Sequence, residues 1–419
     1  MRAEILTIGD ELCRGEIVDT NSSNVAGRLW DLDITTQWMT SCNDVRQDIR
    51  VALETAVGRA EIVLCSGGLG PTEDDLTVDV VSELIGVDPV VHEPARVQMD
   101  AWFARAGMTA VSDEHRQIQL RQVRIPDGAH AFANPAGLAP GFEISLRGIP
   151  VFCVPGVPRE AFAIWDGSLG ARIAQLRDRA GEAERIERRI YRAFGRGESA
   201  ISQACRGIVD GVPGATIHYQ VKFPETLVKL VVRDRDRAAA AARLDAMDAA
   251  IYDRLGSVIY GTGEPMLPEV VVQRLVASQM TLATAESCTG GLIGELVTTI
   301  PGASGAYIGG AITYSNAEKV RQLGVSPATL DAHGAVSEAI ACEMATGCRE
   351  RFGTDIAVAV TGIAGPDGGT ADKPIGTVWV AVASRLGIAT KKLDWPGARD
   401  QIRLLAAWWA LQMVLTAIQ

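Results

Sequence analysis

Short apolar runs alternate with amphipathic segments in the first part of the chain. Apolar runs that end at glycine or proline lie at 3–8, 62–65 and 149–154, and apolar residues with helical spacing lie at 21–32. This alternation is typical of βαβ units in a parallel β-sheet. Ligands of such sheets bind in the loops at the carboxyl ends of the strands. We therefore expect an α/β domain over residues 1–170 with its site in those loops.

The middle of the chain has a different pattern. Strand-like segments at 188–193, 216–220 and 227–232 precede an alanine-rich helical segment at 237–255. This order predicts a small α+β domain, to which we assign residues 171–260.

The last part of the chain returns to alternation after a linker-like segment at 261–265. Helical and strand-like segments follow one another at 268–278, 282–285, 290–299, 311–314, 356–360 and 377–383. We expect a second α/β domain over residues 261–419.

The composition is that of a globular protein, with 47% hydrophobic and 22% charged residues among 419. The most apolar stretch, 404–418, is too short for a membrane span and contains Gln412, so it predicts a buried terminal helix. The N-terminus shows no secretory signal. The eight cysteines are scattered without a C-x-x-C pair, which favours reduced thiols over a zinc site. We expect a cytoplasmic protein without a membrane partner.

The net charge of −11 argues against a dedicated nucleic-acid-binding protein. Residues 1–170 hold 13 basic and 25 acidic residues, a net charge of −12, whereas residues 171–260 carry 16 and 12, a net charge of +4. The middle segment contains Gly211-Val-Pro-Gly214, which has the G-x-x-G spacing of an RNA-binding KH loop. Its proline and the preceding Asp210 suit a phosphate poorly, so we favour a structural role and expect no nucleic-acid partner.

A glycine-rich loop follows the second predicted strand. Backbone N–H groups of Gly67, Gly68 and Gly70 can converge on a phosphate because no Cβ atoms intervene. The following residues, Thr72-Glu-Asp-Asp75, add a hydroxyl and carboxylates, which are ligands that Mg²⁺ prefers. From spacing alone, however, a tight turn leading into an acidic first helical turn is the more common explanation.

A second loop, Glu286-Ser287-Cys288-Thr289-Gly290-Gly291, lies between a predicted strand and a predicted helix. Ser287 can act there as an exposed nucleophile, with amides of the helix N-terminus forming an oxyanion hole. The more common alternative is that Ser287 or Thr289 caps the helix. Cys288 has no neighbouring histidine in the sequence and is a weaker candidate for the nucleophile.

A serine nucleophile without histidine needs another base, and a desolvated lysine is the known substitute. Lysine is rare in this chain, and Lys319 lies in the first turn of a predicted helix that leaves a strand end. Taken alone, Lys319 fits an ordinary surface lysine better.

Together these motifs resemble the CinA family (competence/damage-inducible protein A) over essentially the whole chain. The first domain carries Gly9-Asp10-Glu11-Leu12, Asn21, Gly67–Asp75, Asn134-Pro-Ala-Gly137 and Pro155-Gly-Val-Pro-Arg-Glu160. The middle segment carries Phe194-Gly-Arg-Gly-Glu-Ser199. The last domain carries Ala285–Gly291, Thr313-Tyr-Ser-Asn316 with Lys319, Ala359–Pro366 and Lys373-Pro-Ile-Gly-Thr377.

The resemblance implies two three-layer α/β domains with mainly parallel sheets, joined by a small KH-like α+β domain. It also implies that the last domain is a nicotinamide mononucleotide (NMN) deamidase without a cofactor. Ser287 would attack the carboxamide carbon, with Lys319 as the base and Tyr314 and Thr361 at the reacting centre. The implied substrate contacts come from Thr289, Gly290, Asn316, Gly362, Gly365 and Arg399.

For the first domain, the resemblance implies a molybdopterin-binding-like fold that hydrolyses ADP-ribose with a divalent cation such as Mg²⁺. The sequence holds no Nudix motif, so we expect the cation on Asp74 and Asp75, with Asp10 behind them. The implied substrate contacts are Asn21, Gly67, Gly68, Gly70 and Thr72. Asp10 and the pair Cys13-Arg14 depart from the family motif, which has threonine and an aliphatic pair there.

The expected protein is therefore a bifunctional enzyme of pyridine nucleotide salvage, active as a homodimer on NMN and ADP-ribose. Two alternatives remain open at this point. The first domain can be a nucleotide- or pterin-binding module without turnover, or the protein can serve a regulatory role in DNA uptake or repair.

Overall fold

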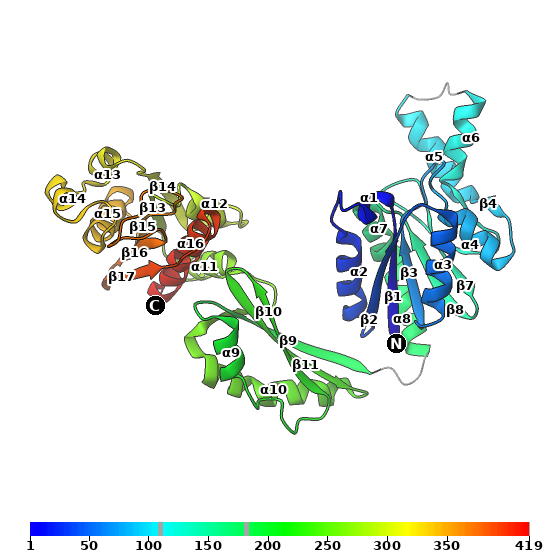
Figure 1. The fold of residues 1–419 in the computed structure, drawn as a ribbon, viewed down its shortest axis with the longest axis horizontal. Helices are drawn as coiled ribbons and strands as arrows, with labels where there is room; N and C mark the ends of the chain where they lie inside the picture. Colours follow the sequence, from blue (N-terminus) through cyan, green and yellow to red (C-terminus); the bar gives the residue numbers. More distant parts are fainter. Residues whose placement is uncertain (108–111, 180–183, 419) are drawn as a thin grey trace. The chain divides into compact units, whose positions relative to one another are not determined.

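The structure, a computed structural model, describes residues 1–107, 112–179 and 184–418. The chain forms two compact units, and Figure 1 shows the elements of each. Unit 1 contains Met1–Ile186 and Asp234–Arg237, and unit 2 contains Glu187–Arg233 and Ala238–Gln419. Residues 171–179 and 184–186 thus group with unit 1. The three-part division of the chain stays a prediction, and its last residue, Gln419, lies outside the described residues.

Unit 1 is built on a six-stranded sheet in the order β2-β1-β3-β8-β7-β6. The first four strands in this order run parallel, whereas β7 and β6 are antiparallel additions. The strands are β1 (Arg2–Ile8), β2 (Thr35–Cys42), β3 (Ile62–Ser66), β6 (His130–Phe132), β7 (Gly141–Leu146) and β8 (Ile149–Val154).

Helices cover both faces of this sheet because its central strands are apolar on both sides. In β1, Leu6 and Ile8 join one buried cluster with residues of α3 and α4, whereas Ala3 and Ile5 join another with residues of α2, α7 and α8. The result is a three-layer α/β domain. The helices are α2 (Thr20–Asp31), α3 (Arg46–Val57), α4 (Thr77–Ile85), α7 (Pro158–Ile164) and α8 (Gly170–Arg179).

Five further elements belong to the described part of unit 1. They are α1 (Asp10–Cys13), α5 (Glu93–Arg105), α6 (Asp113–Arg121) and the antiparallel pair β4 (Pro89–Val91) and β5 (Arg124–Pro126). Helix α5 is anchored by a small cluster of its own, in which Ala95 and Met99 pack with Val123.

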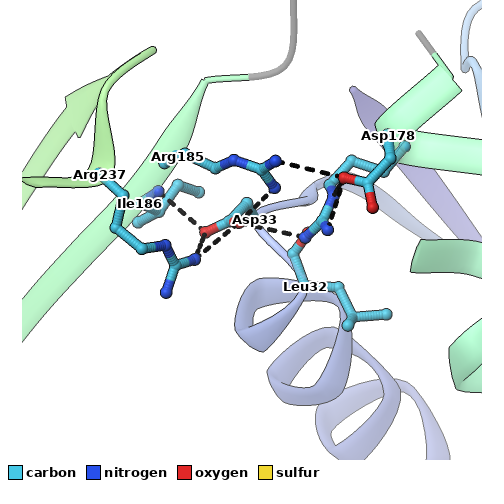
Figure 2. Close-up of polar contacts among 7 residues, drawn as sticks. Leu32, Asp33, Asp178, Arg185, Ile186 and Arg237 are labelled. Carbon is cyan, nitrogen blue, oxygen red and sulfur yellow. Dashed lines mark hydrogen bonds and ion pairs between the residues drawn. The ribbon is translucent and has the colours of Figure 1, made fainter. Parts of the chain in front are cut away.

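The buried carboxylate of Asp33, in the turn after α2, binds arginines from α8 and from the start of the strand that follows α8 (Figure 2). The side chain of Asp33 is 1% exposed and forms ion pairs with Arg177 at 3.1 Å, Arg185 at 3.3 Å and Arg237 at 2.9 Å. It also accepts a hydrogen bond of 2.9 Å from the backbone N–H of Ile186. We call these five residues the Asp33 clamp. A buried charge is tolerated only when it is paired and hydrogen-bonded, and the clamp meets both conditions.

Unit 2 contains two sheets. One has the order β10-β11-β9-β12 and consists of β9 (Arg185–Ala193), β10 (Ala215–Lys222), β11 (Glu225–Asp234) and β12 (Ile259–Thr262), with helices α9 (Glu198–Ala204) and α10 (Arg237–Leu255). The other has the order β14-β13-β15-β16-β17 and consists of β13 (Leu282–Glu286), β14 (Tyr307–Ile312), β15 (Ile356–Gly362), β16 (Thr377–Ser384) and β17 (Gly387–Asp394).

In the second sheet, β14, β13 and β15 run parallel, and β16 and β17 extend it in antiparallel fashion. Separate buried clusters lie on its two faces, one with residues of α11, α12 and α16 and the other with residues of α13 and α15. The prediction of α/β domains with a smaller α+β part is confirmed. The helices are α11 (Leu267–Ala277), α12 (Leu292–Thr298), α13 (Asn316–Leu323), α14 (Pro327–His333), α15 (Glu338–Phe352) and α16 (Arg399–Ala417).

Helix α16 contains the apolar stretch that was predicted to form a buried terminal helix. Its residues Leu405, Ala406, Trp408, Leu411 and Val414 are buried in the core of unit 2. Among the residues that the structure describes, none of the helices is both long and apolar enough to cross a membrane.

Candidate active sites

Ser287 lies directly after β13, in the turn that leads to α12. Its backbone N–H donates to the carbonyl of Val360 in the neighbouring strand β15, and its carbonyl accepts from the N–H of Gly290. Gly290 and Gly291 have φ values of +61° and +99°, which other residues rarely adopt, so the turn needs glycine there. The Ser287 residue is 8% exposed, so the serine is more enclosed than the exposed nucleophile we expected.

The N-terminus of α12 is capped by Glu286. The buried Glu286 carboxylate accepts hydrogen bonds from the backbone N–H groups of Gly291 at 2.9 Å, Ile293 at 3.1 Å and Gly294 at 2.9 Å. Because these amides are already engaged, they do not form the oxyanion hole predicted for this helix N-terminus. The alternative that the side chain of Ser287 or Thr289 caps the helix is also wrong. The N-cap residue is Gly291, Ser287 Oγ contacts Lys319, and the Thr289 hydroxyl has no hydrogen-bond partner among the described residues.

Lys319 lies in α13 and points its amine at Ser287. The Lys319 Nζ atom lies 3.0 Å from Ser287 Oγ and 2.9 Å from the carbonyl oxygen of Thr313. The Lys319 residue is 1% exposed, and this burial lowers the pKa of its amine below the ordinary lysine value. The interpretation of Lys319 as a surface lysine is therefore wrong.

A lysine amine with a lowered pKa is neutral in a larger share of molecules at physiological pH. Neutral Lys319 can accept the Ser287 hydroxyl proton with its lone pair while donating to the carbonyls of Thr313 and Tyr314. The arrangement has the geometry that a serine–lysine nucleophile and base require.

Cys288 is no rival to Ser287 as nucleophile. Its side chain is buried in the apolar core next to α16, and burial raises the pKa of its thiol to about 12. A thiol in this state carries almost no thiolate at neutral pH, and the thiolate is the reactive form.

Arg399, at the start of α16, forms hydrogen bonds with two other residues of the predicted site, Gly365 and Tyr314. Its Nη1 donates to the carbonyl of Gly365, and its Nη2 donates to the Tyr314 hydroxyl at 3.1 Å. The Tyr314 residue is 61% exposed, so this pair lies at the surface near the Ser287 turn. Asn316 is also exposed and is the first residue of α13.

Three further residues of the predicted site make hydrogen bonds or packing contacts that the sequence did not reveal: Thr361, Gly362 and Thr289. The Thr361 hydroxyl donates to the carbonyl of Ala335 at 2.8 Å. A Cβ atom on Gly362 would lie 2.5 Å from a Val378 methyl group, so close strand packing requires glycine there. The Thr289 hydroxyl is buried without a hydrogen-bond partner among the described residues, and its carbonyl accepts from Arg403.

Unit 1 contains a cavity of about 1050 Å³ at the carboxyl ends of its parallel strands. This size is at the upper end of the range for small-molecule sites. Its lining comes from the glycine-rich loop after β3, the loop after β8, helix α5 and the segment 135–139. The predicted loop residues Gly67, Gly68 and Gly70 all line this cavity.

The glycine-rich loop is held tightly against its neighbours. A Cβ atom on Gly67 would lie 2.1 Å from the carbonyl oxygen of Ile8, and one on Gly68 would lie 2.2 Å from Thr77 Oγ1. Thr77, which sequence reasoning missed, donates its hydroxyl to the Gly67 carbonyl at 2.9 Å. The backbone thus comes close to any bound group without interference from side chains.

The acidic residues after this loop differ in their roles. Asp75 Oδ2 accepts hydrogen bonds from the N–H and the hydroxyl of Thr72, so this pair shapes the turn. Asp74 is exposed and lines the cavity. Asp10 instead accepts from the Asp44 N–H at 3.1 Å.

The three predicted metal ligands do not form a ready metal centre. No group of three or more His, Cys, Asp or Glu side chains in the described part of the chain is placed to hold a metal ion. Asp10 is not among the residues that line the cavity, whereas Asp74, Asp75, Asp44 and Glu11 are. Mg²⁺ commonly binds one or two carboxylates together with substrate phosphates, and the donors here fit only that mode.

Asn21 does not line the cavity but contacts two segments that form its wall. Its Nδ2 donates to Ser66 Oγ at 2.8 Å and to the carbonyl of Gly156 at 2.7 Å. Asn21 therefore ties the end of β3 to the loop after β8, two segments that both contribute to the cavity wall.

Comparison with known proteins adds an independent finding. Successive segments of the chain match the families described as probable molybdopterin binding domain (residues 4–175), damage-inducible protein CinA KH domain (188–261) and CinA C-terminal domain (265–418). By fold, the chain is a multidomain α/β protein with a KH-like part.

Two relatives match the chain over nearly its full length, and a solved structure matches part of it. A CinA-like protein of Anaeromyxobacter dehalogenans (strain 2CP-C) is 39% identical over 421 residues and 100% of both chains. A putative competence-damage inducible protein of Symbiobacterium thermophilum is 38% identical over 424 residues, which cover 99% of this chain and 98% of the relative. A solved competence/damage inducible protein from Agrobacterium tumefaciens is 40% identical over 37% of this chain and 98% of its own, with a TM-score of 0.36. The chain belongs to the CinA family.

Proposed function

We propose that unit 2 hydrolyses the carboxamide of NMN to nicotinate mononucleotide and ammonia, as part of pyridine nucleotide salvage in the cytoplasm. The observation that carries this proposal is the 3.0 Å contact between Lys319 Nζ and Ser287 Oγ in a buried site. Membership of the CinA family supports an amidohydrolase role.

In the proposed reaction, neutral Lys319 takes the proton of the Ser287 hydroxyl while Oγ bonds to the carboxamide carbon. The tetrahedral intermediate collapses when its C–N bond breaks, and Lys319 returns the proton to the leaving nitrogen, which departs as ammonia. A water molecule then attacks the Ser287 ester while Lys319 takes its proton. Lys319 returns this proton to Ser287 Oγ as the ester C–O bond breaks, which releases nicotinate mononucleotide and restores the free serine. Arg399 and Tyr314 at the surface offer cationic and hydroxyl donors for the 5′-phosphate.

The direct test is to incubate the full chain with NMN and to measure ammonia and nicotinate mononucleotide. We expect both in equal amounts, without added metal. Nicotinamide riboside, which lacks the 5′-phosphate, serves as the comparison substrate for NMN and should react much more slowly. Absence of ammonia with both compounds would rule out the deamidase proposal.

For unit 1, we propose cleavage of ADP-ribose to AMP and ribose 5-phosphate with a divalent cation. Asp74 and Asp75 would hold the cation together with the diphosphate of the substrate, next to the backbone of Gly67 and Gly68. A cation bound there would neutralise diphosphate charge and assist attack at phosphorus. It would also explain a glycine loop of the phosphate-binding type in a cavity with several carboxylates.

We expect EDTA to stop AMP formation and Asp74→Asn to reduce it by about 100-fold, because one of the few available carboxylate ligands is lost. Glu73→Gln removes a neighbouring exposed carboxylate outside the cavity lining and should leave the rate unchanged. AMP formation that survives both EDTA and Asp74→Asn would contradict the cation proposal. Tight ADP-ribose binding without any turnover would instead favour a binding module.

A further inference from the structure

An exposed tryptophan lines the cavity of unit 1. Trp102 lies in α5 and is 48% exposed, although tryptophan is usually mostly buried. Gln98 precedes it by four residues and Arg105 follows it by three, and both also line the cavity. This spacing places all three side chains on one face of the helix, so α5 presents a continuous surface to the cavity.

Hydrogen bonds attach this face of α5 to the opposite wall. Gln98 Nε2 donates to the carbonyls of Asn134 at 2.7 Å and Gly137 at 2.8 Å. Asn134 Nδ2 in turn donates to Glu160 Oε2 at 2.7 Å, and Glu160 lines the cavity. The helix face therefore has a fixed position relative to the rest of the site.

The indole ring itself is supported from behind. The rings of Trp102 and Phe103 meet edge to face, with centroids 5.1 Å apart and planes at 81°. Phe103 packs against the cluster of Met99 and Val123 that anchors α5. An aromatic side chain held in place this way loses little conformational entropy when a ligand packs on it.

The cavity thus has two chemically different parts. The glycine-rich loop offers close backbone and the acidic residues Asp74 and Asp75, whereas the α5 face offers an indole ring and the Arg105 guanidinium. We infer that Trp102 is the platform on which the planar ring of a nucleotide stacks, while its phosphates lie at the glycine-rich loop. This inference rests on the proposed nucleotide chemistry of unit 1 and assigns Trp102 a role in specificity.

Stacking of a base on an aromatic side chain is worth enough to change affinity by about fivefold to 100-fold. We therefore expect Trp102→Leu to weaken AMP binding to the full chain by about tenfold or more in calorimetry. Trp102→Phe keeps an aromatic ring and should stay within about threefold of the wild type. Ribose 5-phosphate has no planar aromatic ring to stack, so its affinity should be the same in all three proteins.

Trp395→Leu is the matched control, because Trp395 is a similarly exposed tryptophan in unit 2. It should leave AMP binding unchanged. The inference is wrong if Trp102→Leu leaves AMP affinity unchanged, if it weakens AMP and ribose 5-phosphate equally, or if the wild type binds neither. Failure of the proposed function is a separate result: ADP-ribose would then yield no AMP, while the calorimetric difference between AMP and ribose 5-phosphate would persist.

Discussion

Replacing Ser287 by alanine is expected to lower ammonia release from NMN at least a thousandfold. The Ser287 Oγ atom is the group that lies 3.0 Å from the Lys319 amine, and loss of a nucleophile typically costs several orders of magnitude. The substitution removes one oxygen atom and leaves the turn intact, because the turn depends on the backbone N–H and carbonyl of Ser287. The affinity for NMN, measured by calorimetry, should therefore change little.

Cys288→Ala is the matched control for Ser287→Ala. It changes the next residue in the same turn and removes a thiol that is buried and protonated. We expect it to lower thermal stability slightly, through loss of packing, and to keep most of the activity. Substantial ammonia release by Ser287→Ala would exclude the serine mechanism, and loss of activity confined to Cys288→Ala would transfer the role of nucleophile to the thiol.

Replacing Lys319 by methionine is expected to reduce the same activity by about a thousandfold, because Ser287 loses its base. Methionine fills a similar volume and brings no charge into the buried site, so the variant should fold. Lys319→Arg should be equally inactive, since an arginine side chain stays protonated. Lys222→Met, which changes an exposed lysine in unit 2, should behave as wild type.

The pH dependence of the wild type tests the same role of Lys319. The base is the neutral amine, so kcat/KM should rise with pH, with unit slope below the pKa of Lys319, and then level off. Because burial lowers this pKa, the plateau should begin at a lower pH than for an exposed lysine. A rate that falls as pH rises through this range would mean that the protonated amine is the active form.

Some buried elements and one edge strand, β10, were predicted well from the sequence, whereas two other edge strands were not. Strand β8 and helix α10 have the bounds that their apolar patterns predict. Strands β2 and β17 were missed, and both lie at the edges of their sheets. Edge strands are partly exposed and therefore carry polar residues, so they lack the continuous apolar run that marks a central strand.

The candidate sites were predictable only in part, for a physical reason. Ser287 and Lys319 lie in different elements, and no local pattern reveals that two such residues meet in the fold; their pairing came from family resemblance. Glu286 was missed as a helix cap because it comes from the end of the preceding strand rather than from the N-cap position. In unit 1, Asp44 contributes to the cavity from a segment that carries no motif.

The Asp33 clamp also has a consequence for fragments of the chain, because a fragment must include the clamp arginines to keep the Asp33 carboxylate paired. The family match for the first domain ends at residue 175, before Arg177, Arg185 and Arg237. A fragment cut there would keep a buried carboxylate and lose every guanidinium group that balances it, at a cost of about 3–5 kcal/mol. Any exchange of this domain between relatives must therefore carry residues well beyond its sequence boundary, including the short segment Asp234–Arg237, which supplies Arg237 to the clamp.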